Sequence, residues 1–166
     1  MSERKSPLPA VALALLLCAL SLLPSAAQKR RLPDKAIVGT WVLFSKQFEG
    51  ERPKYAGREY SQIKYYGPTG EYACAEVVKV GKYFTILPHE YGTYTYNKGQ
   101  YTEMGRKGEF VIKGNTASGH WRNSLSVWKK VTIPKDLLSE VLLRCKHNEA
   151  PPQAMQREIR KYILNK

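Results

Sequence analysis

The sequence has few of the residues and motifs that mark common enzyme sites. It contains three cysteines and three histidines. His89, His120 and His147 fall in an expected loop, strand and helix end, without the short spacings typical of metal ligands. No Cys-x-x-Cys pair, Gly-x-Ser-x-Gly elbow, P-loop or dinucleotide fingerprint is present. We therefore assign no catalytic residue, no metal site and no cofactor from the sequence.

Acidic residues are also scarce. Asp and Glu number 14 against 27 Lys and Arg, which gives a formal net charge of +13 at pH 7. Such a charge attracts anionic partners such as lipid headgroups, acidic glycans or nucleic acid. The basic residues are scattered, so a solvated surface that favours solubility is the simpler interpretation. Three glutamates, Glu71, Glu76 and Glu103, could be brought together for acid–base chemistry, although strand carboxylates more often face water.

Long hydrophobic runs are absent except near the N-terminus. There, a mostly apolar stretch from Leu8 to Leu23 follows a positively charged start, and small residues precede the end at Ala27. A good membrane-spanning helix needs about 20 apolar residues. We therefore expect residues 1–27 to be a signal peptide cleaved after Ala27, which predicts export to the periplasm or out of the cell. The alternatives are an uncleaved anchor and a lipoprotein acylated at Cys18, although Leu17 does not suit a lipoprotein peptidase.

Cleavage would leave two cysteines, Cys74 in an expected strand and Cys145 in an expected helix. In an oxidising compartment the two can form a disulfide that joins the C-terminal segment to the sheet. The alternative is two separate buried thiols that behave as small apolar side chains. The sequence does not decide between them.

The middle of the chain has the pattern of an all-β domain. All but one of the aromatic residues lie between Trp41 and Trp128, in short runs separated by glycine-containing turns. The short connections favour an antiparallel up-and-down meander of eight or nine strands that closes into a barrel and so removes its exposed edges. We expect a linker at 28–35 and the barrel at 36–131. The expected strands are 37–48, 58–66, 71–80, the two sides of the turn at 97–99, 107–113, 117–122 and 125–131, with 82–88 either a short strand or part of a loop.

Five short motifs lie on these strands in a fixed order. They are Gly39-x-Trp41, the strand–turn–strand 65–72, Gly92-Thr93-Tyr94 facing Tyr101-Thr102-Glu103, His120-Trp121, and Trp128-Lys129-Lys130-Val131. In this order the chain resembles the lipocalin-like families of the calycin type, and in particular small exported bacterial proteins classed as a lipocalin-like domain of unknown function. The resemblance covers about 37–131. It implies a barrel in which Gly39, Trp41 and Trp128 are structural positions and Trp41 packs across a closed end, and it implies no established activity.

Residues 132–166 extend beyond the closing strand and are expected to form two helices. The first begins near Pro134 and carries an apolar stripe at helical spacing that should lie against the barrel. The stripe consists of Leu137, Leu138, Val141, Leu142 and Cys145. The second helix, from about 152 to 164, has Arg157, Arg160 and Lys161 opposite an apolar side. That arrangement suits the barrel, an anionic membrane surface or a partner protein.

Two classes of function follow from these patterns. The first is a binding protein that holds a small hydrophobic or amphipathic ligand in the barrel, because Tyr and Trp side chains can both pack and hydrogen-bond. The residues expected to line the site are Tyr72, Tyr94, Tyr101, Phe110 and Trp121. The alternative is an interaction protein that uses its basic surface, the last helix or the loops at 49–57 and 83–90. Nucleic acid is an unlikely partner for an exported protein, and the sequence does not indicate an oligomeric state.

Overall fold

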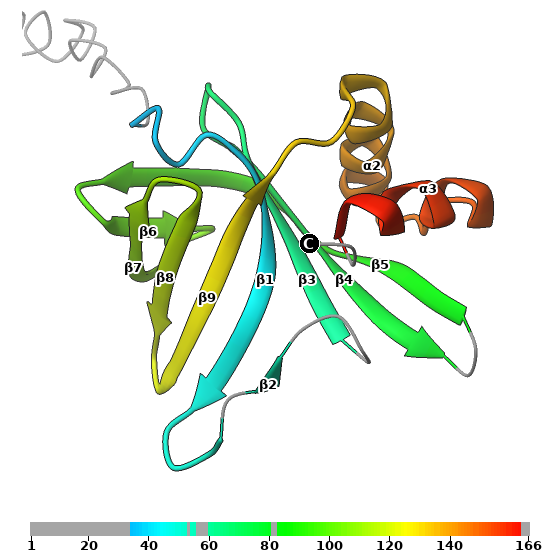
Figure 1. Cartoon of the computed structure of the whole chain (residues 1–166). Coiled ribbons are helices and arrows are strands. Elements are labelled where there is room, and N and C mark those ends of the chain that lie inside the picture. The colour runs from blue at the N-terminus through cyan, green and yellow to red at the C-terminus, as the bar shows by residue number, and fades with distance from the viewer. Residues whose placement is uncertain (1–33, 53, 56–59, 81–82, 164–166) are drawn as a thin grey trace, which may run out of the picture. The chain divides into compact units, whose positions relative to one another are not determined.

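The computed structural model describes residues 34–52, 54–55, 60–80 and 83–163; the expected signal peptide lies outside them. Within these residues nine strands form one antiparallel sheet in the order β2-β1-β3-β4-β5-β6-β7-β8-β9, and β1 also pairs with β9. That pairing closes every strand except β2 into a barrel (Figure 1), so the predicted up-and-down barrel of eight or nine strands is confirmed, with eight strands in the closed barrel. The strands are β1 Gly39–Phe48, β2 Lys54–Tyr55, β3 Tyr60–Tyr66, β4 Glu71–Val80, β5 Tyr83–Asn97, β6 Gln100–Glu103, β7 Arg106–Lys113, β8 Thr116–Trp121 and β9 Ser124–Val131.

Strand β5 differs from the sequence-based expectation. The segment expected to end at Pro88 and the first strand of the expected hairpin form one continuous strand of 15 residues, which pairs with β4 from Tyr83 to Thr93 and with β6 from Tyr94 to Asn97. Cys74 pairs with Glu90 and Ala75 with Pro88, which leaves His89 as the extra residue of a bulge. A bulge tolerates a proline and re-aims the neighbouring side chains. The prediction of a recognition loop at 83–90 is therefore wrong, because these residues belong to β5. The other predicted loop contains a turn and the short β2, and its remaining residues lie outside the described ones.

Two helices follow the barrel, as predicted. Helix α2 covers Lys135–His147, with Pro134 before its first turn, and α3 covers Gln153–Ile163. The buried residues of α2 are Val141 and Cys145, both on the predicted stripe, and α3 buries Ile159 and Ile163. Figure 1 shows both helices beside β3, β4 and β5, and α2 contacts β4 and β5 while α3 contacts β5. None of the described helices is long and apolar enough to cross a membrane.

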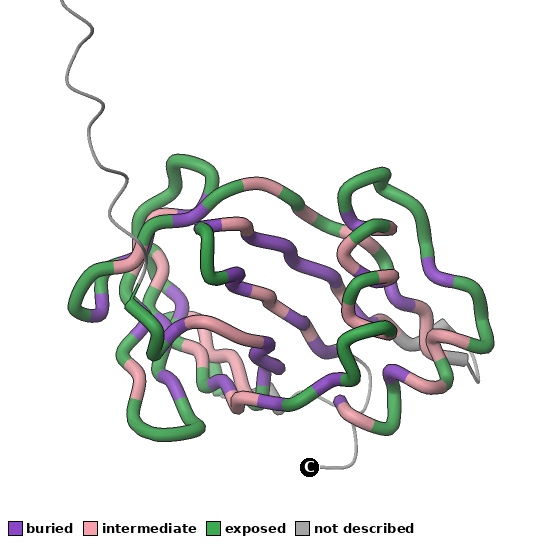
Figure 2. Tube along the Cα trace, turned by 90° about the horizontal axis from the view of Figure 1, so that it is seen from above, coloured by how far each residue is buried: buried purple, intermediate pink, exposed green. Residues whose placement is uncertain are grey.

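The sheet separates two hydrophobic clusters. The inner cluster lies inside the barrel and is mainly aromatic, whereas the outer cluster lies between the sheet and the helices and is mainly aliphatic. Strand alternation produces this division on β4, where Tyr72 and Cys74 belong to the inner cluster and Ala73, Ala75 and Val77 to the outer one. Figure 2 shows the buried stretches on the strands and the exposed stretches at the turns.

Candidate functional site

One end of the barrel is closed around Trp41. Its side chain is fully buried, and its indole nitrogen donates a hydrogen bond to the carbonyl of Ile37 at 2.8 Å. The ammonium of Lys130 lies 5.3 Å from the centre of the indole ring. Gly39, with φ of +130°, leaves space for this lysine, because a Cβ at residue 39 would lie 2.8 Å from Lys130 Cε. Gly39 thus allows Lys130 to pack over the buried Trp41.

The rest of the interior contains a cavity of about 200 Å³ that is bounded by both aromatic and charged side chains. Of the residues predicted to line a site, Tyr72, Tyr101, Phe110 and Trp121 are at the cavity wall. Phe110 also makes edge-on contact with Trp41, at 5.2 Å between ring centroids. The walls therefore offer flat apolar surface for a ligand to pack against.

Tyr94 and Trp128 do not take the places expected from the sequence. Tyr94 is buried near the closed end, where its hydroxyl donates to the carbonyl of Gly67 at 2.7 Å, and it is not part of the cavity wall. Trp128, assigned only a structural role, does line the cavity, and its indole nitrogen donates to Ser126 Oγ at 2.8 Å. Gly119 gives Trp128 its space, because a Cβ there would lie 3.1 Å from the indole nitrogen.

A buried ion pair between two residues of the cavity wall was not predicted. The ammonium of Lys64 on β3 donates to both carboxylate oxygens of Glu103 on β6, at 2.9 and 2.8 Å. The two side chains are only 12% and 6% exposed. Three rings surround the same ammonium, those of Tyr72, Tyr101 and Trp128, at 5.3 to 5.6 Å. Cation–π attraction therefore adds to the ion pair in holding Lys64 in place.

Tyrosine hydroxyls complete the environment of the pair. Tyr66 is fully buried and donates a hydrogen bond to Glu103. Burial and the adjacent Glu103 carboxylate hold the pKa of Tyr66 well above its usual value, and burial likewise raises the pKa of Tyr72 and Tyr101. These phenols therefore stay protonated at neutral pH and act as hydrogen-bond donors.

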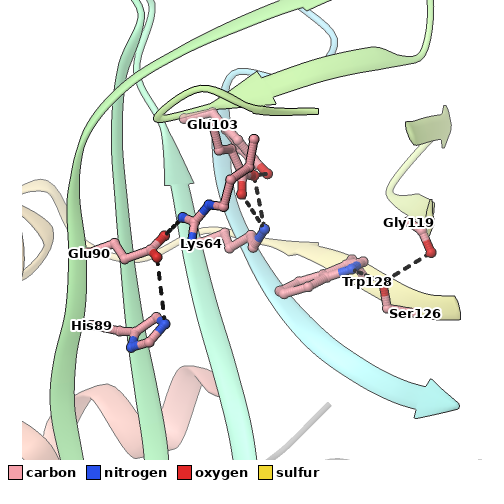
Figure 3. A network of polar contacts seen from close by, with 9 residues as sticks. Lys64, His89, Glu90, Glu103, Gly119, Ser126 and Trp128 are labelled. Atoms are coloured by element: carbon pink, nitrogen blue, oxygen red, sulfur yellow. Dashed lines mark hydrogen bonds and ion pairs between the residues drawn. The ribbon is translucent and has the colours of Figure 1, made fainter. Parts of the chain in front are cut away.

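The bulge in β5 brings two more titratable residues to the open end of the cavity. Glu90 accepts a hydrogen bond from the guanidinium of Arg106 on β7, and His89 Nε2 lies 3.7 Å from the other oxygen of Glu90. Burial tends to raise the pKa of Glu90, but the hydrogen bond and the charges of Arg106, His89 and Lys64 outweigh it, so the pKa is lowered. Figure 3 shows Glu90, Lys64, Glu103 and Trp128 around a common space.

The two cysteines are free thiols in this structure, so the disulfide considered from the sequence is not formed. Cys74 belongs to the inner cluster and Cys145 to the outer one, and Cys145 Sγ meets the carbonyl oxygen of Cys74 at 4.0 Å. Because the strand backbone lies between the two side chains, a bridge would require β4 to turn over. Burial raises the pKa of Cys74 to about 12 and that of Cys145 to about 11.

Two negative findings complete the description of the site. Among the described residues, no group of three or more His, Cys, Asp or Glu side chains is placed to hold a metal ion. No protein-family model matches the chain, and no curated protein is significantly similar to it. The closed antiparallel barrel with its C-terminal helices is compatible with the lipocalin-like fold that the sequence motifs resemble.

Proposed function

We propose that this protein binds a small amphipathic molecule inside the barrel. The observation that supports the proposal is the cavity of about 200 Å³, which is open at one end and walled by aromatic rings and by the Lys64–Glu103 ion pair. Ligand sites characteristically combine apolar walls with a small number of convergent polar groups. A cavity of about 150 Å³ is large enough to accept benzene, so the ligand is about the size of one ring or a short chain.

The proposal includes export of the protein, which is supported by the sequence of residues 1–27. In that setting a small carrier or scavenger would meet its ligand outside the cytoplasm. The competing idea of a membrane- or partner-binding α3 has less support, because Ile159 and Ile163 on its apolar side are buried in the outer cluster.

Native mass spectrometry tests the proposal. The protein would be purified, without denaturation, in the form its host produces, and weighed under native and then denaturing conditions. We expect an added mass of one small molecule that survives high salt, since contacts inside a cavity are screened little by salt, and that is lost on unfolding.

A pair of variants locates the binding. Ser126→Leu places an apolar side chain at the cavity wall on β9, whereas Ser118→Leu makes the same change at an exposed position on β8. We expect the first variant to lose the added mass and the second to keep it. A wild-type protein with no added mass in the native spectrum, and with no affinity for any ring-sized probe, would refute ligand binding in the barrel. So would equal binding by the two variants.

A further inference from the structure

The hydrogen-bonding capacity around the cavity is unbalanced in favour of donors. Both oxygens of Glu103 accept from Lys64, and one of them also accepts from Tyr66. One oxygen of Glu90 accepts from Arg106, and the other faces His89. These two carboxylates therefore already have cationic partners from the chain itself, and Glu76 is the third carboxylate of the cavity wall.

Arg106 and Lys64 both have more N–H groups than the hydrogen bonds described for them. Arg106 has five N–H groups, and among the described residues its hydrogen bonding goes to Glu90 alone. Its side chain is 42% exposed at the open end, so the remaining N–H groups are accessible to a molecule that enters. Lys64 has three N–H groups, and both of its hydrogen bonds go to the same carboxylate, Glu103.

For a cationic ligand, the favourable aromatic position in the cavity is already occupied. The three rings that could surround an ammonium already surround that of Lys64. A second positive charge nearby would be repelled by Lys64 and Arg106. The formal net charge of +13 adds a long-range field that draws small anions towards the protein and repels cations.

We infer that the cavity is selective for small monocarboxylates with a ring or short apolar body, whose carboxylate binds Arg106 at the open end while the body packs between Tyr101, Phe110 and Trp128. This inference rests on the proposed function and adds the charge of the ligand. The Glu90–Arg106 pair lowers the affinity for the ligand carboxylate, because Glu90 competes with that carboxylate for the guanidinium.

Three probes of nearly equal size test the inference: benzoate, benzyl alcohol and benzylamine. Binding is followed by two-dimensional NMR of the tryptophan indole N–H groups at fixed salt and pH 7. We expect benzoate to bind at least about tenfold more tightly than benzylamine, which corresponds to one charge-assisted hydrogen bond. Benzyl alcohol should lie between them.

Three variants assign the selectivity to Arg106. Arg106→Gln should weaken benzoate binding by about tenfold and leave benzyl alcohol almost unchanged. Lys107→Gln makes the same charge change at the next residue of β7, which is exposed and outside the cavity wall, and should have little effect. Glu90→Gln should strengthen benzoate binding, since it frees the guanidinium and removes a negative charge.

The outcomes separate the two proposals. Equal affinities for the three probes, or equal effects of Arg106→Gln and Lys107→Gln, would overturn the charge selectivity and leave ligand binding in the barrel intact. Tighter binding of benzylamine would overturn it as well. Failure of all three probes to bind the wild-type protein would overturn the inference, and it would contradict the proposed function as well if the native mass spectrum also shows no added mass.

Discussion

The two sides of the barrel wall are packed by different chemistry. On the inner side, Tyr66, Tyr72 and Trp128 combine apolar rings with polar atoms and leave space for a cavity and an ion pair. On the outer side, Ala73 and Ala75 let α2 approach β4 closely, and the cluster there is made of aliphatic side chains and a thiol with partly buried aromatic residues at its margin. The comparison shows that the outer layer is held by apolar packing, whereas the inner layer combines packing with buried charged and polar groups.

The largest effect is expected from breaking the ion pair of the inner side. Lys64→Met leaves the carboxylate of Glu103, only 6% exposed, without its charged partner. Removing one partner of a buried pair costs about 3–5 kcal/mol, and urea-induced unfolding at pH 7 measures the loss. A stability within about 1 kcal/mol of the wild type would show that the pair behaves like an exposed one.

A double variant separates the loss of the pair from the loss of packing. In Lys64→Met with Glu103→Gln no charge remains buried, and Tyr66 can still donate a hydrogen bond to the amide oxygen. Replacement of both partners of a buried pair is often close to neutral, so we expect the double variant to regain most of the lost stability. A double variant no more stable than Lys64→Met would mean that the aromatic contacts of Lys64, rather than its charge, carry the effect.

The outer side is tested at Ile159, a residue of α3 whose side chain is fully buried. Ile159→Ala removes buried methyl and methylene groups and should cost about 2–5 kcal/mol. The neighbouring Glu158→Ala is a control: the Glu158 side chain is 45% exposed and pairs with Lys161 one turn away, so the change is expected to alter stability by about 0.5 kcal/mol or less. Both variants are also tested for binding to vesicles that contain anionic lipid. An Ile159→Ala protein of unchanged stability that binds such vesicles less well would place α3 on a membrane instead of the barrel.

The fold could be predicted because its signals are local. The alternation from Tyr72 to Val77 and the glycine turns need no knowledge of the partner strand, and the helical stripe of α2 is equally visible in the sequence. The continuity of β5 is different, because the bulge at His89 depends on how β4 pairs with it. The segment 82–88 was expected to be a short strand or part of a loop, whereas in the structure Pro88 pairs with Ala75 beside the bulge.

The candidate site was only partly predictable, because its charges are paired over long distances in the sequence. Lys64 and Glu103 lie on different strands and meet only when the barrel closes. A signal did exist: Glu103 is two residues from Tyr101, and Lys64 is two residues from Tyr66, so each shares a face with an inward aromatic residue. This signal was missed because carboxylates on strands were assumed to face water. Arg106 begins β7 after a turn, and no periodicity indicates where its side chain goes.

The smallest effect concerns the second ion pair of the inner side, Glu90 with Arg106, which is more exposed than the first. The pKa of Glu90 is lowered in the folded protein. Its contribution to stability is therefore present above the unfolded-state pKa of about 4.3 and is lost as the pH falls through the folded-state value. Glu90→Gln should be less stable than the wild type by about 0.2–1 kcal/mol at pH 7, and the difference should shrink as the pH is lowered to 3.

Urea unfolding of the two proteins between pH 7 and pH 3 measures this convergence, and Arg106→Gln provides the control. Because Arg106 supplies the hydrogen bond that lowers the pKa of Glu90, the Glu90→Gln substitution should have a weaker pH dependence when made in the Arg106→Gln background. If the two stability curves instead stay parallel down to pH 3, Glu90 is not held ionised by its neighbours. The charged open end would then resemble an ordinary solvated surface, and Lys64–Glu103 would be the ion pair that sets the inner side apart from the apolar outer side.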